Sequence, residues 1–320
     1  VPARAAFWAG ANIIFDFRKP QFDGNFTFYV NKEIAKDITL TGYQGEKAGE
    51  ILMHFSSLNK WYVYVGQPSK RCGIKLSSPA ISLSGYFVSG TEVPPIPDLP
   101  DKIRNELNIQ KPVRNEIVKG GAGFGFGAEF SLNTGEKKFL FMSASLDLLV
   151  GFDMSLMKYE NASCDGITTR AIGIDGWYAQ GQLYAFAEGK INANIDVWFY
   201  EGKVEIMNCK AGLLLQGAMP NPSWMYGAIG GSYRLFNGAI KGKFNFDLEI
   251  GDRCQPALLQ NSPVENLEIV SDVKPSNNAS GIDIFERPEI LCNFKLAQEI
   301  AIDVVDNNGK PKTRVFRPKL

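Results

Sequence analysis

The sequence predicts an all-β protein of antiparallel hairpins that form two sandwich- or solenoid-like β units, with one short helix in the connector. Glycine (32) and phenylalanine (22) are abundant among its 320 residues; glycine disfavours helices, and aromatic residues favour pleated strands. Several segments alternate apolar and polar residues with a period of two, which is the pattern of a strand with one buried face. Turn signals such as Asn237-Gly238 separate these segments.

One clear alternation runs from Ile191 to Phe199 and is followed by the candidate turn Glu201-Gly202. A two-residue loop at that turn predicts that Phe199 faces Val204 across a hairpin. A similar pattern at residues 9–31 suggests an internal duplication.

Residues 93–118 interrupt the strands. They begin with a proline-rich run that is typical of an extended connector. Asp101 is expected to cap a short helix, because Ile103 and Leu107 lie one turn apart after it. The predicted organisation is a first β unit (1–92), this connector (93–118), a second β unit (119–255), a linker (256–283) and strands that start or complete a further β module (284–320).

The hairpin at residues 232–250 allows two environments. Asn237-Gly238 places Leu235 opposite Ile240, and apolar residues then alternate with charged ones as far as Ile250. A soluble sandwich would bury the apolar side, whereas a membrane barrel would turn it towards lipid. Dispersed charges, proline-rich connectors and the lack of evenly spaced aromatic girdles favour the soluble assembly.

Composition argues against several classes of function. The 34 basic and 34 acidic residues cancel without a dense basic patch, so nucleic acid is not an expected partner. No apolar run reaches 18 residues, so no transmembrane helix is expected. The five cysteines form no CxxC or Cys/His cluster, which predicts no metal site. The GxGxxA match at residues 123–128 leads into a strand instead of a helix, so no nucleotide cofactor is expected.

No catalytic residue is predicted, and the chain is not expected to be an enzyme. His54 is the only histidine, and no GxSxG motif accompanies it. A pair of carboxylates could still serve glycoside hydrolysis, although sequence spacing does not show that two of them converge. The alternative is that these carboxylates lie solvated on an outer face. The acidic residues near aromatic ones are Asp175, Glu188, Asp196, Glu201 and Glu205.

Aromatic residues of the second β unit are the candidate binding surface. Flat aromatic surfaces beside Asn and Asp stack sugar rings or dock protein partners. The alternative is that a second sheet or a neighbouring module covers them. The predicted platform comprises Trp177, Tyr178, Trp198, Tyr200, Trp224 and Tyr226.

Cys164 and Cys254 are the candidate disulfide partners. Each lies just after a predicted strand and beside an Asp residue. A bond between them would close the second β unit and stabilise it by about 3–5 kcal/mol.

Several motifs carry a resemblance to a family. They are WYVYVG at 61–66, YFVxG at 86–90, GWYAQGQLYA at 176–185, LLQG at 214–217 followed by PNPxW at 220–224, and GKFNF at 242–246 before GxxC at 251–254. Together they resemble uncharacterised, very large β-rich surface proteins of Bacteroidota, over roughly residues 1–255. The resemblance implies a large secreted or outer-membrane-associated polypeptide, exported by the type 9 route and used in adhesion, gliding or envelope architecture.

The expected function is a non-catalytic structural or adhesive β module of a large extracellular, cell-surface protein. The expected partners are other segments of the same polypeptide or other surface proteins, with glycans as a further class. The first alternative is a carbohydrate-binding or glycoside-hydrolysing module, and the second is an outer-membrane β-barrel.

Overall fold

The structure is a computed structural model that divides into two compact units, Val1–Ala257 and Leu258–Leu320. The residues it describes are 6–31, 39–77, 79–109, 122–159, 162–164, 172–198, 200–254, 256–258, 270–275, 280, 287, 289–292, 299–305 and 311–316.

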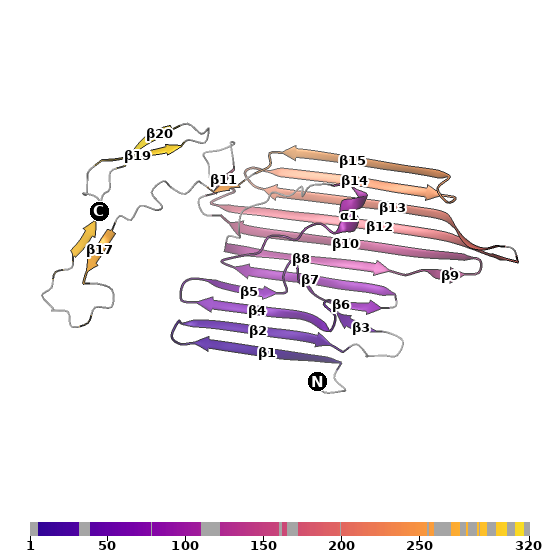
Figure 1. Ribbon diagram of the computed structural model, residues 1–320, viewed down its shortest axis with the longest axis horizontal. Coiled ribbons are helices and arrows are strands. Elements are labelled where there is room, and N and C mark those ends of the chain that lie inside the picture. Colours follow the sequence, from indigo (N-terminus) through magenta and orange to yellow (C-terminus); the bar gives the residue numbers. More distant parts are fainter. Residues whose placement is uncertain are drawn as a thin grey trace. The chain divides into compact units, whose positions relative to one another are not determined.

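The first unit contains one large antiparallel sheet (Figure 1). Eleven of its strands lie side by side in chain order, each antiparallel to the next. These strands are β1 (Phe7–Asp16), β2 (Gln21–Val30), β4 (Lys47–Ser56), β5 (Trp61–Val65), β7 (Ala80–Gly90), β8 (Ala122–Asn133), β10 (Met142–Lys158), β12 (Trp177–Val197), β13 (Tyr200–Met219), β14 (Trp224–Leu235) and β15 (Ile240–Gly251).

Short elements flank this path. β3 (Leu40–Gly42) pairs with β6 (Cys72–Ser77), β6 also pairs with β7, and β9 (Lys137–Phe139) pairs with β10. Outside the large sheet, β11 (Ala162–Cys164) pairs with β16 (Pro256–Leu258). The helix α1 spans Asp101–Glu106. The second unit contains two hairpins, β17 (Val270–Lys274) with β18 (Glu289–Cys292) and β19 (Ile300–Val305) with β20 (Pro311–Phe316).

The predicted all-β class, the antiparallel hairpins and the short helix are confirmed. The ranges predicted as two β units are joined edge to edge, because β7 pairs with β8 from Ala80↔Asn133 to Gly90↔Gly123. The connector between them therefore does not separate two sheets. The predicted opposition of Leu235 and Ile240 after Asn237-Gly238 is also present.

Two local predictions are wrong. The turn between β12 and β13 follows Val197, which pairs with Tyr200, instead of falling at Glu201-Gly202; Phe199 lies outside the described residues. Val204 consequently faces Ala193. The helix α1 begins at Asp101, follows Pro100 as its N-cap, and has no side-chain capping hydrogen bond.

The two faces of the sheet differ in environment. Leu149, Asp153 and Met157 point to one face and are buried; we call it the covered face. Val150 and Phe152 point to the opposite, exposed face, which we call the open face. Side chains alternate between faces along a strand, so the strand register assigns every other strand residue to one face or the other.

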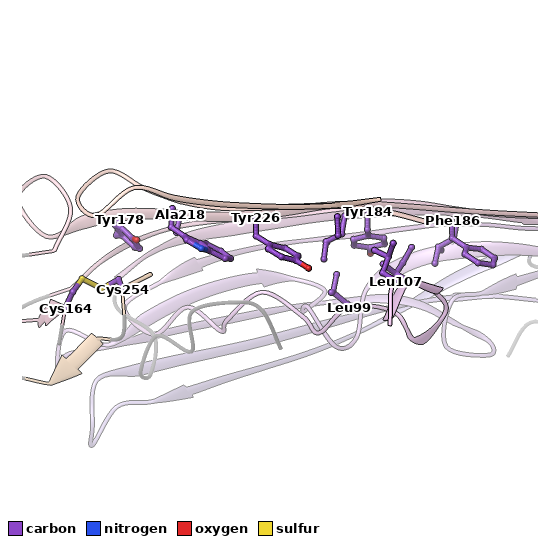
Figure 2. Packing of buried hydrophobic residues seen from close by; sticks show 14 of the residues in the cluster. Leu99, Leu107, Cys164, Tyr178, Tyr184, Phe186, Ala218, Tyr226 and Cys254 are labelled. Carbon is purple, nitrogen blue, oxygen red and sulfur yellow. A yellow bond between two sulfur atoms is a disulfide. The ribbon is translucent and has the colours of Figure 1, made fainter. Parts of the chain in front are cut away.

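Residues 92–109, which we call the strap, cross the covered face and carry α1 (Figure 1). Leu99, Ile103 and Leu107 of the strap are buried in one cluster with side chains from β10 and β12–β14 (Figure 2). Leu107 lies against the cross-strand pair Gly212 and Gly230. A Cβ atom at either glycine would lie 3.1–3.3 Å from Leu107 Cδ2, so the missing side chains create the space in which the strap packs.

We expect neighbouring leucines of β13 to differ sharply in their contribution to stability. Leu214 is 1 % exposed on the covered face, whereas Leu215 is 45 % exposed on the open face. Leu214→Ala should lower the free energy of unfolding by about 2–5 kcal/mol, because it leaves a cavity. Leu215→Ala should cost under ~1 kcal/mol, since little buried area is lost. Urea unfolding of both variants under the same conditions would measure the difference, and equal costs would contradict the assignment of faces.

Candidate functional site

A buried ion pair lies on the covered face beneath the strap. Arg71 lies in the turn between β5 and β6, and Asp153 lies on β10. Arg71 Nη2 is 2.8 Å from Asp153 Oδ1, with side-chain exposures of only 6 % and 0 %. Burial alone would lower the pKa of Arg71, but the nearby Asp153, Tyr184 and Glu129 raise it above its ordinary value. The guanidinium group therefore stays charged.

Hydrogen bonds extend this pair across β8 and β12. Tyr184 donates its hydroxyl proton to Glu129 Oε2 at 2.8 Å. Gln182 Nε2 lies 3.0 Å from Asp153 Oδ2 and also 3.0 Å from the carbonyl oxygen of Pro97 in the strap. Gln216 of β13 donates in turn to Gln182 Oε1 at 3.2 Å. The network thus links four strands of the sheet to the strap.

The strap has further polar anchors along the covered face. Ser232 of β14 donates to Glu106 Oε1 at 2.8 Å, and Asn245 of β15 donates to the Leu107 carbonyl at 2.7 Å. Lys102 pairs with Asp147 of β10. These contacts fix backbone and side chains of the strap at several points, so they position it on the sheet.

The structure does not bring the six platform aromatics together. Tyr178, Trp224 and Tyr226 lie on the covered face within the buried cluster. The same cluster contains Leu99, Ile103 and Leu107 of the strap. Tyr178 donates to the Pro222 carbonyl at 2.9 Å, and the Arg253 guanidinium lies over the Trp224 ring at 5.1 Å. Trp177 points to the open face. Trp198 is 96 % exposed in the β12–β13 turn, and the side chain of Tyr200 lies outside the described residues.

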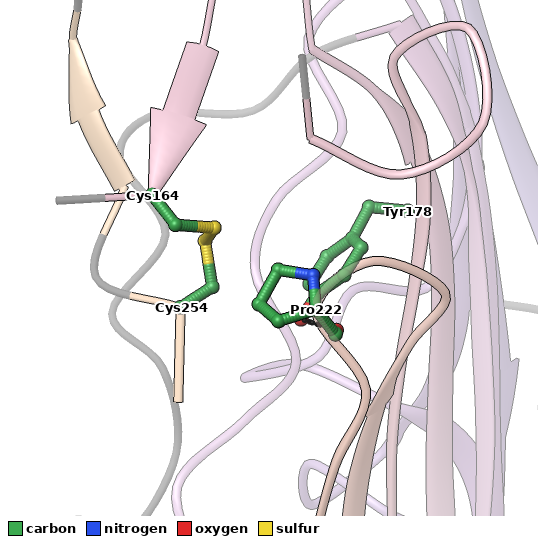
Figure 3. The surroundings of a disulfide bond; sticks show 4 residues. All are labelled: Cys164, Tyr178, Pro222 and Cys254. Atoms are coloured by element: carbon green, nitrogen blue, oxygen red, sulfur yellow. Dashed lines mark hydrogen bonds between the residues drawn. A yellow bond between two sulfur atoms is a disulfide. The ribbon is translucent and has the colours of Figure 1, made fainter. Parts of the chain in front are cut away.

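The disulfide predicted between Cys164 and Cys254 is present (Figure 3). Both residues are buried beside Tyr178 and Pro222, and their Cα atoms are 4.9 Å apart. The bond closes a chain separation of 90 residues. It therefore ties the segment after β10 to the end of β15. Cys72 and Cys209 are free thiols.

The other sequence candidates have ordinary structural partners. His54 Nδ1 lies 2.7 Å from Asp23 Oδ1 on the neighbouring strand. The GxGxxA match lies within β8, with no helix after it among the residues described there. Glu188 pairs with Lys190 and Lys210, and Glu205 pairs with Arg234.

The open face was not identified from the sequence. On the eleven strands its side chains are apolar, aromatic or small, and Lys158 at the end of β10 is the single charged side chain that their described residues place there. On the short strand β9, Lys137 pairs with Ala144 and points to the same face. A hollow of about 370 Å³ lies on this face, with Gly181 and Gly217 among its lining residues. Phe152, Leu183 and Met225 also line it. Recognising the face required the register of every strand, which the sequence alone did not supply.

The chain was compared with protein-family models, with curated proteins and with solved structures, and no match was found. In the described part of the chain, no group of three or more His, Cys, Asp or Glu side chains is placed to hold a metal ion. No helix among the described residues is long and apolar enough to span a membrane.

Breaking the buried ion pair should be costly. Asp153→Ala would leave the Arg71 charge buried without its partner, which should reduce the free energy of unfolding by about 3–5 kcal/mol. Asp147→Ala removes a half-exposed pair with Lys102 and should cost no more than about 1 kcal/mol. Denaturant titration measures both values. Similar losses in the two variants would contradict a structural role for the Arg71–Asp153 pair.

Removing the disulfide should also destabilise the first unit. The paired variant Cys164→Ser with Cys254→Ser should lose about 3–5 kcal/mol, because a long loop is no longer closed in the unfolded chain. Mass spectrometry after alkylation, with and without reduction, tests whether the bond forms. Two alkylated thiols at these positions in the unreduced protein would disprove it.

Proposed function

We propose that the large sheet is the wall of a membrane-embedded β structure in the cell envelope. Its open face lies against lipid acyl chains, and its covered face with the strap faces a polar interior. Its role is structural and non-catalytic, as part of an outer-membrane-associated surface protein.

The segregation of charge between the two faces carries this proposal. On β15, the charged residues Lys241, Lys243, Asp247 and Glu249 all point to the covered side, while Phe246 and its even-numbered neighbours point to the open side. The same division holds across the eleven strands, with Lys158 as the exception. An exposed apolar surface of this extent is unusual on a monomer in water. Apolar side chains that face lipid and polar ones that face inward are the pattern of membrane-spanning strands.

The position of Lys158 on the open face also supports a bilayer. Lys158 is the last residue of β10 and pairs directly with Trp177, the first residue of β12. Lysine and tryptophan are favoured at the membrane–water interface, where a polar end reaches water and an apolar body stays in lipid.

Strand length fits the same environment. Nine to eleven tilted residues cross the hydrocarbon core of a bilayer. Seven strands of the path have 10 to 12 residues, β5 has 5, and β10, β12 and β13 have 17, 21 and 20. The longer strands would extend beyond the membrane.

The adhesive role, carbohydrate binding and glycoside hydrolysis stay predictions. The burial of Tyr178, Trp224 and Tyr226 gives the glycan platform no support. Dispersed charges along the sequence had favoured a soluble assembly, but the strand register gathers those charges on one face.

Fluorescent labels on adjacent residues of β15 test the proposal. Phe246 and Asp247 are both exposed, on opposite faces. In a background with Cys72, Cys209 and Cys292 replaced by serine, Phe246→Cys and Asp247→Cys would each carry an environment-sensitive dye. In phospholipid vesicles, acyl-brominated lipid should quench the dye at 246, and aqueous iodide should quench the dye at 247.

The neighbouring position is the matched control, because both labels share one strand and one depth. Equal quenching of both dyes by iodide, with no effect of brominated lipid at 246, would overturn the membrane assignment.

A further inference from the structure

The two edges of the sheet constrain what lies beside it. Among the described strands, β1 pairs only with β2, and β15 pairs only with β14. Each edge strand therefore presents a row of backbone donors and acceptors on its outer side. Such a row is a template for pairing with a further strand.

Neither edge carries a proline or a bulge that would prevent pairing. Native proteins protect free edges with prolines, bulges or charged side chains; β15 carries four charges, all on the covered side and none on the open side. β1 and β15 contain no proline, and their registers with β2 and β14 run without a bulge. The open face stays apolar up to both edges, through Ile13 and Phe15 on β1 and Phe246 and Leu248 on β15.

The direction of the edge strands limits the partner. Ten successive antiparallel pairings connect the eleven strands of the path, so β1 and β15 run in the same direction, as their arrows show in Figure 1. Direct closure of β15 onto β1 would bring parallel strands together. Two copies with the same orientation in a membrane would also meet through parallel strands, whichever edges they used.

We infer that these edges pair with an odd number of antiparallel strands from a polypeptide segment outside residues 1–320. Those strands alternate apolar and polar side chains in step with β1 and β15. The inference rests on the proposed function, because the membrane gives all strands a common frame. Bacterial outer-membrane barrels of a single chain contain an even number of antiparallel strands, and eleven strands plus an odd number give an even total.

Photo-cross-linking at two positions of one edge tests the inference. Benzoylphenylalanine would replace Phe246 or Leu248 in the protein expressed from its own gene, in its native envelope. Mass spectrometry then identifies the cross-linked peptide. We expect both positions to reach one segment outside residues 1–320, and moving the probe two residues towards the C-terminus should shift the linked site about two residues towards the N-terminus of the partner. Ile13 and Phe15 on β1 provide a second, independent pair.

The control is Ile229 on β14, which lies directly across from Phe246 on the open face but in the interior of the sheet. It should cross-link only within residues 1–320, to its own neighbouring strands. Three outcomes would overturn the inference. The linked site could move towards the C-terminus of the partner when the probe does, which would indicate parallel strands. The linked peptide could come from another copy of residues 1–320, or no cross-link to an outside segment could exceed that found at Ile229.

The label experiment at residues 246 and 247 keeps the two proposals distinguishable. Antiparallel cross-links without quenching by brominated lipid would refute the membrane but keep the edge pairing. Quenching by brominated lipid together with cross-links between copies of residues 1–320 would support the membrane assignment and refute the edge pairing with an outside segment.

Discussion

The register of side chains across the sheet is the constraint on which the rest of the structure depends. A strand turns alternate residues to opposite faces, and pairing aligns each strand with the next. Because the eleven strands keep this alignment, nearly every charged side chain of these strands lies on the covered face. The buried Arg71–Asp153 pair, the strap and the apolar open face all follow from that single division. A shift of one residue in any strand would exchange its faces and place charges among the apolar side chains.

The covered face shows how the polar side of the sheet is stabilised. Charged groups that leave water need partners, and Arg71, Asp153 and Gln182 supply them to one another. Around this network, the strap buries Leu99, Ile103 and Leu107. Polar anchoring and apolar packing therefore hold the same segment, so the strap is a fixed part of the fold.

Local patterns predicted the elements well, and contacts distant in sequence determined the rest. The alternation before Ile250 and the turn Asn237-Gly238 depend on neighbouring residues, and both were predictable. Trp224 was assigned to an exposed platform, but it is buried in a cluster that also contains strap residues more than a hundred positions earlier in the sequence. The turn after β12 follows Val197 instead of falling at Glu201-Gly202, and the bulge at residues 191–192 shifts the register by only one residue, so it does not account for the difference. The surroundings of the two sheet faces could not be predicted either, because the alternation of apolar and polar residues does not say which side of a strand meets water.

Flotation of the purified chain with phospholipid vesicles tests the central claim most directly. The chain should float with the vesicles and should need detergent to stay in solution without them. Leu248→Lys, on the open face, should weaken insertion by up to ~2–4 kcal/mol, whereas Asp247→Lys, on the opposite face of the same strand, should leave flotation unchanged. A folded, monomeric chain that remains in the aqueous fraction without detergent would contradict a membrane-facing sheet.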